Sequence, residues 1–201
     1  MTRRLTPPYG DNEEVQFEVP QLSDGVVALR LLTPADATAY AYAFSEDPEL
    51  GRLLGFDSDP TLAELGVSLA GVAERADAGQ GVELAIVGTA DDRFLGSVLL
   101  FAFSDRHRRC ELGFWIVPDA RRAGFGRRAV ALALDWVFGE LAVERVEMTT
   151  TPENTVIPAF ARSLGFSYEG RLRRRNRERG ERIDILWFGL LDHEWVRAGA
   201  A

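Results

Sequence analysis

The stretch VPDARRAGFGRRAV, Val117–Val130, places two glycines two residues apart within a cluster of four arginines. It joins a strand-like segment at 110–117 (CELGFWIV) to an alanine-rich, helix-like segment at 127–141. The first N–H groups of a helix have no partner inside the helix, and the helix dipole places partial positive charge there. Glycine lets the backbone turn sharply and approach a ligand closely. The stretch therefore predicts either a strand-to-helix turn or a site for an anion such as phosphate.

Two common phosphate-binding motifs do not fit this stretch. A dinucleotide site of the Rossmann type needs G-x-G-x-x-G near the start of a domain and an acidic residue about 20 positions later. Only G-x-G is present, at Gly124 and Gly126. The Walker motif requires a lysine, and the chain contains none. The surrounding arginines are either a solvated rim or additional positive charge around a bound anion.

The order of the predicted elements indicates a single α+β domain. Hairpins next to one strand–helix–strand crossover favour a mixed sheet with helices packed on it. Strands are predicted at 26–32, 82–88, 94–103, 110–117, 143–151, 167–173 and 182–191, and helices at 33–45, 61–78, 127–141 and 156–166. We expect residues 1–25 to be a mobile tail, 26–195 the domain, and 196–201 a second tail.

The composition is that of one globular domain with an uneven charge distribution. The 201 residues are 46% apolar and contain one cysteine, Cys110, so we expect no intrachain disulfide, no metal site and a cytoplasmic location. No apolar run approaches the ~18 residues of a membrane span. The net charge is −8, but 17 of the arginines lie after residue 100. We therefore expect an anionic ligand to bind the second half, and the overall acidity disfavours nucleic acid.

Several blocks in the second half resemble one enzyme family. RRAGFG matches the R/Q-x-x-G-x-G/A motif of the GNAT superfamily of N-acetyltransferases at Arg121, Gly124 and Gly126. The blocks ELGFWIVPDARRAGFG, AVERVEMTTTPENT, FARSLGFSYEGRLR and DILWFGLL, with LRLLTPADA earlier, are similar to the branch that includes ribosomal-protein N-terminal (alanine/serine) acetyltransferases. The resemblance covers about residues 26–192. It implies a GNAT fold, that is, a mixed, mostly antiparallel sheet with helices on both faces. It also implies transfer of an acetyl group from acetyl-CoA to a primary amine, either a protein N-terminus or a small molecule.

The resemblance also implies where acetyl-CoA binds. Its pyrophosphate would lie on backbone N–H groups of residues 122–127, and its pantetheine arm between the strands at 110–117 and 143–150. Backbone groups near Ile116 and Val117 would hold the thioester end, and Asn154 would contact the arm. The implied set is Ile116, Val117, Arg121, Arg122, Ala123, Gly124, Phe125, Gly126, Arg127 and Asn154.

Glu111 is the predicted general base. An alkyl amine is mostly protonated at pH 7, so a proton must be removed before it can attack a thioester. Strand alternation places Glu111 on the face of Gly113 and Trp115. A carboxyl group at the edge of a cleft beside aromatic rings can have a raised pKa. The alternative is a solvated glutamate on an edge strand.

The proton donor for the departing thiolate has no candidate in the sequence. Related enzymes often carry a serine three residues after the asparagine or a tyrosine four before the glycine of LGF, where this chain has Ile157 and Ala161. Two alternatives follow: a catalytically weak GNAT-fold acyl-CoA sensor or interaction module, and a transferase of a larger acyl group such as succinyl. The oligomeric state also stays open, with a homodimer as one alternative.

The segment RLRRRNRERGER, 171–182, contains seven arginines and two glutamates. We interpret it as a solvated hairpin with a loop at 174–181. The alternative is a docking site for an acidic protein substrate or for the 3′-phosphate of the cofactor.

Overall fold

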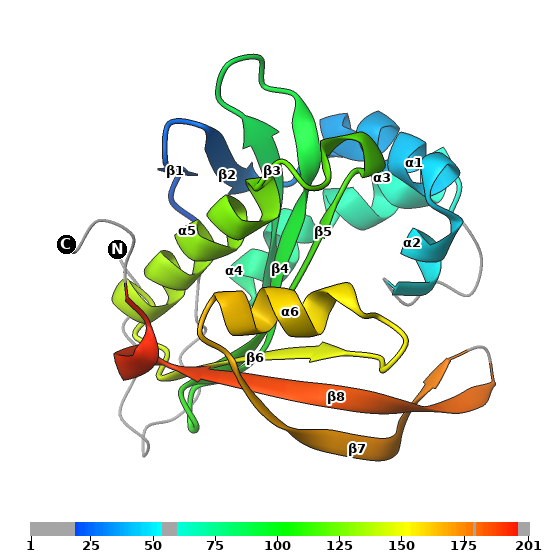
Figure 1. Ribbon diagram of the computed structural model, residues 1–201. Helices are drawn as coiled ribbons and strands as arrows, with labels where there is room; N and C mark the ends of the chain where they lie inside the picture. Colours follow the sequence, from blue (N-terminus) through cyan, green and yellow to red (C-terminus); the bar gives the residue numbers. More distant parts are fainter. Residues whose placement is uncertain (1–18, 54–59, 179, 197–201) are drawn as a thin grey trace.

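The computed structural model describes residues 19–53, 60–178 and 180–196 (Figure 1). Within these ranges the strands form one eight-stranded sheet in the order β1-β2-β3-β4-β5-β6-β8-β7. The strands are β1 (Leu22–Ser23), β2 (Val27–Leu31), β3 (Gly81–Gly88), β4 (Phe94–Ser104), β5 (Arg109–Ile116), β6 (Arg145–Thr150), β7 (Ser167–Glu178) and β8 (Glu181–Leu191). The helices are α1 (Ala37–Glu46), α2 (Pro48–Leu53), α3 (Leu62–Ala70), α4 (Val72–Asp77), α5 (Phe125–Gly139) and α6 (Val156–Ser163).

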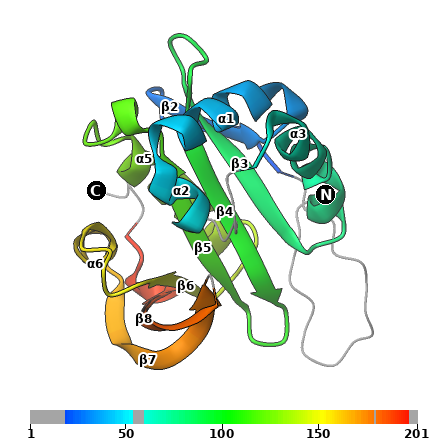
Figure 2. The same ribbon diagram turned by 90° about the vertical axis from the view of Figure 1, so that its right-hand side faces the viewer.

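Helices cover both faces of this sheet. α5 crosses one face, and α1 to α4 lie on the opposite face, as two perpendicular views show (Figures 1 and 2). All strand pairs are antiparallel except β5 with β6. The predicted α+β class, the mostly antiparallel sheet and the helices on both faces are therefore confirmed.

An apolar stripe fixes α5 on the sheet. Val130, Leu134 and Val137 are fully buried, and they belong to the same cluster as Leu84 of β3 and Leu112 of β5. Burial of each such side chain contributes about 1.5–3 kcal/mol. None of the helices in the described parts of the chain is long and apolar enough to span a membrane.

The parallel pair β5–β6 is short. The two strands pair from Arg109–Arg145 to Glu111–Glu147, and residues 112–116 of β5 have no partner in β6. β6 instead pairs with β8 along its whole length. The middle of the sheet therefore opens beyond Glu111, and one edge of β5 is left without a neighbouring strand.

One predicted helix is two helices. The pattern at 61–78 breaks at Gly71 into α3 and α4. Thr61 and Glu64 form a capping box at the start of α3, with the Thr61 N–H donating to Glu64 Oε2 at 2.8 Å. α2 lies where we predicted no helix. Glycine is a poor helix former, so the break at Gly71 is where the chain can turn at low cost.

Two predicted boundaries are wrong. Residues 22–25, placed in the tail, contribute β1 and the turn into β2. Much of the loop expected at 174–181 is strand, because β7 extends to Glu178 and β8 begins at Glu181. Exposed arginines do not prevent backbone pairing in a hairpin that lies at the edge of the sheet. The predicted tails at 1–18 and 197–201 lie outside the described residues.

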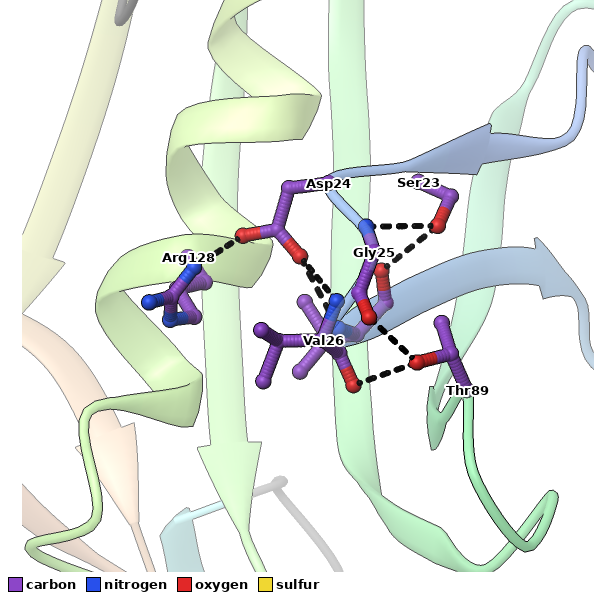
Figure 3. A network of polar contacts seen from close by, with 7 residues as sticks. Ser23, Asp24, Gly25, Val26, Thr89 and Arg128 are labelled. Atoms are coloured by element: carbon purple, nitrogen blue, oxygen red, sulfur yellow. Dashed lines mark hydrogen bonds and ion pairs between the residues drawn. The ribbon is translucent and has the colours of Figure 1, made fainter.

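The β1–β2 turn is tied to α5 through Asp24 (Figure 3). Asp24 Oδ1 accepts hydrogen bonds from the N–H groups of Val26 and Val27, both at 2.9 Å, and Oδ2 pairs with Arg128 Nη1 at 2.7 Å. Burial raises the pKa of this carboxyl, but the hydrogen bonds from Val27, Arg128 and Val26 outweigh it, and the net pKa is lowered. One side chain thus shapes the turn and anchors the start of α5.

We expect Asp24→Ala to lower the free energy of unfolding at pH 7 by about 1–2 kcal/mol, because two backbone N–H groups lose their acceptor. A lowered folded-state pKa stabilises the protein above the unfolded pKa of about 3.9, and that stability is lost as the pH falls through the folded pKa. Urea denaturation across this range should show the wild-type advantage shrinking in acid. The comparison variant Arg128→Gln loses only a partly exposed ion pair and should cost less. Equal losses for the two variants would contradict this account.

Candidate active site

The turn before α5 presents a row of unpaired backbone N–H groups. Arg122 and Gly124 have positive φ angles of 63° and 85°, so the chain curls back immediately before Phe125 begins the helix. The first backbone hydrogen bond of α5 runs from the Arg128 N–H to the Gly124 carbonyl. In the described residues no acceptor lies against the N–H groups of residues 122–127. Such a concave row at a helix N-terminus is suited to a phosphate or pyrophosphate.

Glycine is needed at the two positions of the turn for different physical reasons. Gly124 adopts a left-handed conformation that costs other L-residues about 1–2 kcal/mol, and a Cβ there would meet no atom within 4 Å. A Cβ at Gly126 would lie 3.0 Å from Phe114 and 3.3 Å from Ile116. Gly126 therefore lets the first turn of α5 pack on the end of β5. α5 begins at Phe125, two residues before the predicted start.

The side chains of Arg121 and Arg127 hold the turn in place. Arg121 donates from Nε to the carbonyl of Ile116 at 3.0 Å and pairs with Asp47 at the end of α1. Arg127 Nη1 donates to the carbonyl and hydroxyl oxygens of Ser163 in α6, at 2.7 and 2.9 Å. Because both guanidinium groups are engaged in these contacts, we expect the two residues to contact an anion through their backbone N–H groups.

Arg122 is the arginine of the cluster that keeps its charge available. Arg128 is held by Asp24, and no partner for the Arg122 guanidinium occurs in the part of the chain that the structure describes. The charged rim that the sequence suggested is thus reduced to one side chain above a backbone cradle.

The open edge of β5 offers further donors. The Val117 N–H donates to the carbonyl of Leu95 in β4 at 2.9 Å, so by strand alternation the N–H of Ile116 points to the opposite edge, toward β6. β6 is not paired with β5 there. Thr151, immediately after β6, has a buried hydroxyl without a hydrogen-bond partner among the described residues. An extended amide chain such as pantetheine fits an edge with these unused polar groups.

Asn154 also caps a helix. Its Oδ1 accepts from the N–H groups of Val156 and Ile157, at 3.1 and 3.2 Å, at the start of α6. Because Oδ1 is used in this way, the predicted contact of Asn154 with the cofactor arm would be made by its side-chain amide nitrogen, which can still donate a hydrogen bond.

Glu111 lies where β5 and β6 separate. It is half-buried, with Phe101 of β4 and Glu147 of β6 beside it in the register. Burial, and then the charge of Glu147, raise its pKa above the ordinary value, while Arg109 and Arg175 oppose the shift. A carboxyl group with a raised pKa beside an opening in the sheet is suited to accept a proton from a substrate.

Sequence reasoning did not identify Glu147 as part of the candidate site. It is 6% exposed and accepts from Arg109 Nη1 and Arg145 Nε, both at 2.9 Å. Two arginines therefore hold a carboxylate next to Glu111. A glutamate within the short strand RVEMTT was the available signal, but its partner becomes visible only once the strand register is known.

A second polar cluster on this face was also missed. Tyr40 of α1 and Ser97 of β4 both donate to Oε1 of Glu83 in β3, Ser97 at 3.1 Å. The Tyr40 ring meets Trp115 edge-on, with centroids 4.8 Å apart. Burial and the charge of Glu83 raise the pKa of Tyr40 above its ordinary range, so its hydroxyl stays protonated. In the described residues no group of three or more potential metal ligands occurs.

A family model described as "Acetyltransferase (GNAT) domain" matches residues 27–167. The chain belongs to the GNAT acetyltransferase family. It is therefore an N-acetyltransferase by class, and the resemblance drawn from its sequence blocks is confirmed. Acyl-CoA and an amine acceptor are the substrates typical of GNAT enzymes.

Named relatives cover most of this GNAT chain at low identity. The putative ribosomal N-acetyltransferase YdaF of Bacillus subtilis is 26% identical over 84% of the chain and 93% of its own length. Spermidine N(1)-acetyltransferase of Escherichia coli K12 is 28% identical over 57% of the chain and 61% of its own length. The structure of Mycobacterium smegmatis RimJ in complex with CoA-disulfide has a TM-score of 0.76 and 25% identity, covering 87% of this chain and 86% of that one.

Substitution of Arg127 should affect mainly stability, whereas substitution of Arg122 should affect mainly ligand binding. We expect Arg127→Gln to lower the free energy of unfolding by about 1 kcal/mol or more, because its bonds to Ser163 are lost. Arg122→Gln should change it by less than about 0.5 kcal/mol but weaken CoA binding several-fold in low salt. Urea denaturation and calorimetric titration with CoA measure the two quantities. The reverse pattern would contradict the assignment of the free charge to Arg122.

Proposed function

We propose that this GNAT enzyme transfers the acetyl group of acetyl-CoA to a primary amine by direct attack, with Glu111 as the general base. The observation that carries the proposal is the position of Glu111. Its carboxyl group has a raised pKa and lies at the point where β5 and β6 part, at the start of the open edge of β5, the strand that leads into the N–H cradle. The backbone of residues 122–127 would hold the pyrophosphate, and the Ile116 N–H would face the thioester end.

The chemistry assigned to the chain is proton removal and positioning. Glu111 takes a proton from the alkylammonium group, directly or through water, and frees the nitrogen lone pair. The nitrogen attacks the thioester carbonyl carbon, a C–N bond forms, the C–S bond breaks, and the thiolate takes up a proton. Ile157 and Ala161 stand where a donor is often found, and Ala161 is fully buried, so this proton comes from solvent or from the reacting amine.

The acceptor is a primary amine of a protein N-terminus or a small molecule. Both classes appear in the names of relatives, one a putative ribosomal N-acetyltransferase and one a spermidine N-acetyltransferase. The missing donor at Ile157 and Ala161 favours a second candidate function, an acyl-CoA-binding module with weak turnover. Release of free thiol with a panel of amines separates the two functions.

Acetyl-CoA at about 1 mM should raise the melting temperature, since a ligand that binds only the folded state stabilises it by mass action. Acetyl-pantetheine lacks the pyrophosphate and should give a much smaller shift, because the cradle at 122–127 has nothing to bind. Differential scanning fluorimetry measures both shifts. No shift with acetyl-CoA, or equal shifts with the two compounds, would overturn the cofactor assignment.

Glu111→Gln should lower kcat/KM by about 10²–10⁴-fold, the usual contribution of a general base. A base must be unprotonated to act, so wild-type activity should rise with pH through the raised pKa of Glu111, and the variant should lose this acidic limb. The exposed Glu140→Gln, at the far end of α5, is the matched control and should keep both rate and profile. An acidic limb that persists in Glu111→Gln would assign the base elsewhere.

A further inference from the structure

A row of four charged side chains crosses the sheet beside Glu111. Glu147 of β6 accepts hydrogen bonds from Arg109 of β5 and from Arg145 of its own strand, both at 2.9 Å. Arg145 then pairs through both terminal nitrogens with the carboxylate of Glu169 in β7, with Nη1 2.8 Å from Oε1. We call these four residues, Arg109, Glu147, Arg145 and Glu169, the charge row. The mechanism above uses none of them.

Gly189 leaves the space through which the charge row passes over β8. This strand lies between β6 and β7 (Figure 2), and Gly189 is opposite Glu147 on one side and Ser167 on the other. A Cβ at Gly189 would lie 2.5 Å from Glu169 Oε1 and 2.7 Å from both terminal nitrogens of Arg145. The ion pair between β6 and β7 therefore depends on a glycine in the strand between them.

The strand register brings the Glu147 carboxylate to the proposed base. Glu111 and Glu147 are opposite each other in the parallel pair, so their Cα atoms are about 4.8 Å apart and their side chains lie on one face. Glu147 is buried, and a buried carboxylate is costly unless cations and hydrogen bonds offset its lost hydration. Arg109 and Arg145 supply both. In the described residues Glu111 itself accepts no hydrogen bond, so the arginines are committed to its neighbour.

The charges that act on Glu111 come from three strands. In the described parts of the chain they are Glu147 of β6, Arg109 of β5 and Arg175 of β7, whereas the register neighbour in β4 is the uncharged Phe101. Burial and then the charge of Glu147 raise the pKa of Glu111, and the two arginines oppose this rise. Among these three charges Glu147 is the one of the same sign as an ionised Glu111, and its effect is larger than that of either arginine.

We propose that Glu147 is a positioning residue, which holds a fixed negative charge beside Glu111 and so makes Glu111 a stronger proton acceptor. A carboxylate binds a proton more tightly when a like charge lies next to it. A more basic group removes a proton from an alkylammonium group more readily. The proposal rests on the proposed function, because it requires Glu111 as the base.

Carboxyl 13C NMR of the full chain, labelled at the glutamate side chains, measures the titration of Glu111 directly, and Glu111→Gln identifies its signal. In Glu147→Gln the midpoint of this titration should move to lower pH, because a like charge is lost. In Arg109→Gln it should move to higher pH, because an opposite charge is lost. Glu147→Asp keeps the negative charge and should stay close to the wild type.

Glu144→Gln is the matched control, because it removes an ion pair with Arg108 just before β6 but leaves the charge row complete. Its midpoint should equal that of the wild type. If Glu147→Gln does not fold, the double variant Arg109→Gln/Glu147→Gln removes a cation and an anion together and leaves fewer unpaired charges. Its midpoint should still fall, since Glu147 acts on Glu111 more strongly than Arg109 does. An unchanged midpoint in these Glu147 variants, or an equal shift in Glu144→Gln, would overturn the proposal.

Activity tests the proposed function separately. With the amine that releases most thiol in the panel, the acidic limb of kcat/KM in Glu147→Gln should move to lower pH together with the NMR midpoint. The plateau of kcat should fall by about two- to fivefold, because Glu111 becomes a weaker base. A limb that stays in place while the carboxyl signal moves would assign the base elsewhere, and the influence of Glu147 on Glu111 would stand. A lower plateau with neither the signal nor the limb moved would reduce Glu147 to a structural role.

Discussion

The short pairing of β5 with β6 is the constraint on which the rest of the site depends. The two strands share only the three positions from Arg109 to Glu111, and beyond them the sheet opens. The opening leaves the Ile116 N–H at an unpaired edge and gives Glu111 a half-buried place beside it. If β5 and β6 were paired along their whole length, those backbone groups would be hydrogen-bonded within the sheet, and an extended ligand could not pass between the strands.

The cradle before α5 is held from three directions before any ligand arrives. Asp24 from the β1–β2 turn, Asp47 from the end of α1 and Ser163 from α6 each take one arginine of the motif. A helix N-terminus that is fixed in advance costs little reorganisation when an anion binds. The arginines thus serve the site mainly by fixing the backbone, which presents the donors.

Parts of the candidate site that are close together in the sequence could be predicted, and parts that are far apart in the sequence could not. The turn with free N–H groups at 122–127 could be predicted because a contiguous pattern of strand, glycines and helix specifies it, and Glu111 could be nominated because a family resemblance points to it. Glu147 and the Tyr40–Glu83 contact could not, since their partners lie 36 and 43 residues away and meet only through the register of the sheet. The β7–β8 hairpin was predicted, but its loop was made too long at 174–181, because a run of arginines suggests a loop, whereas edge-strand pairing needs only backbone groups.

The electrostatic balance at Glu111 links these features. Burial and the neighbouring Glu147 raise its pKa, and Arg109 and Arg175 limit the rise. Because Arg109 also binds Glu147, removing that arginine would take away the attractive charge and at the same time free the repulsive one. The pKa of Glu111 therefore responds to charged residues at both ends of the β5–β6 pair. The pairing that opens the sheet thus also raises the pKa of the proposed base, because it places Glu147 beside Glu111.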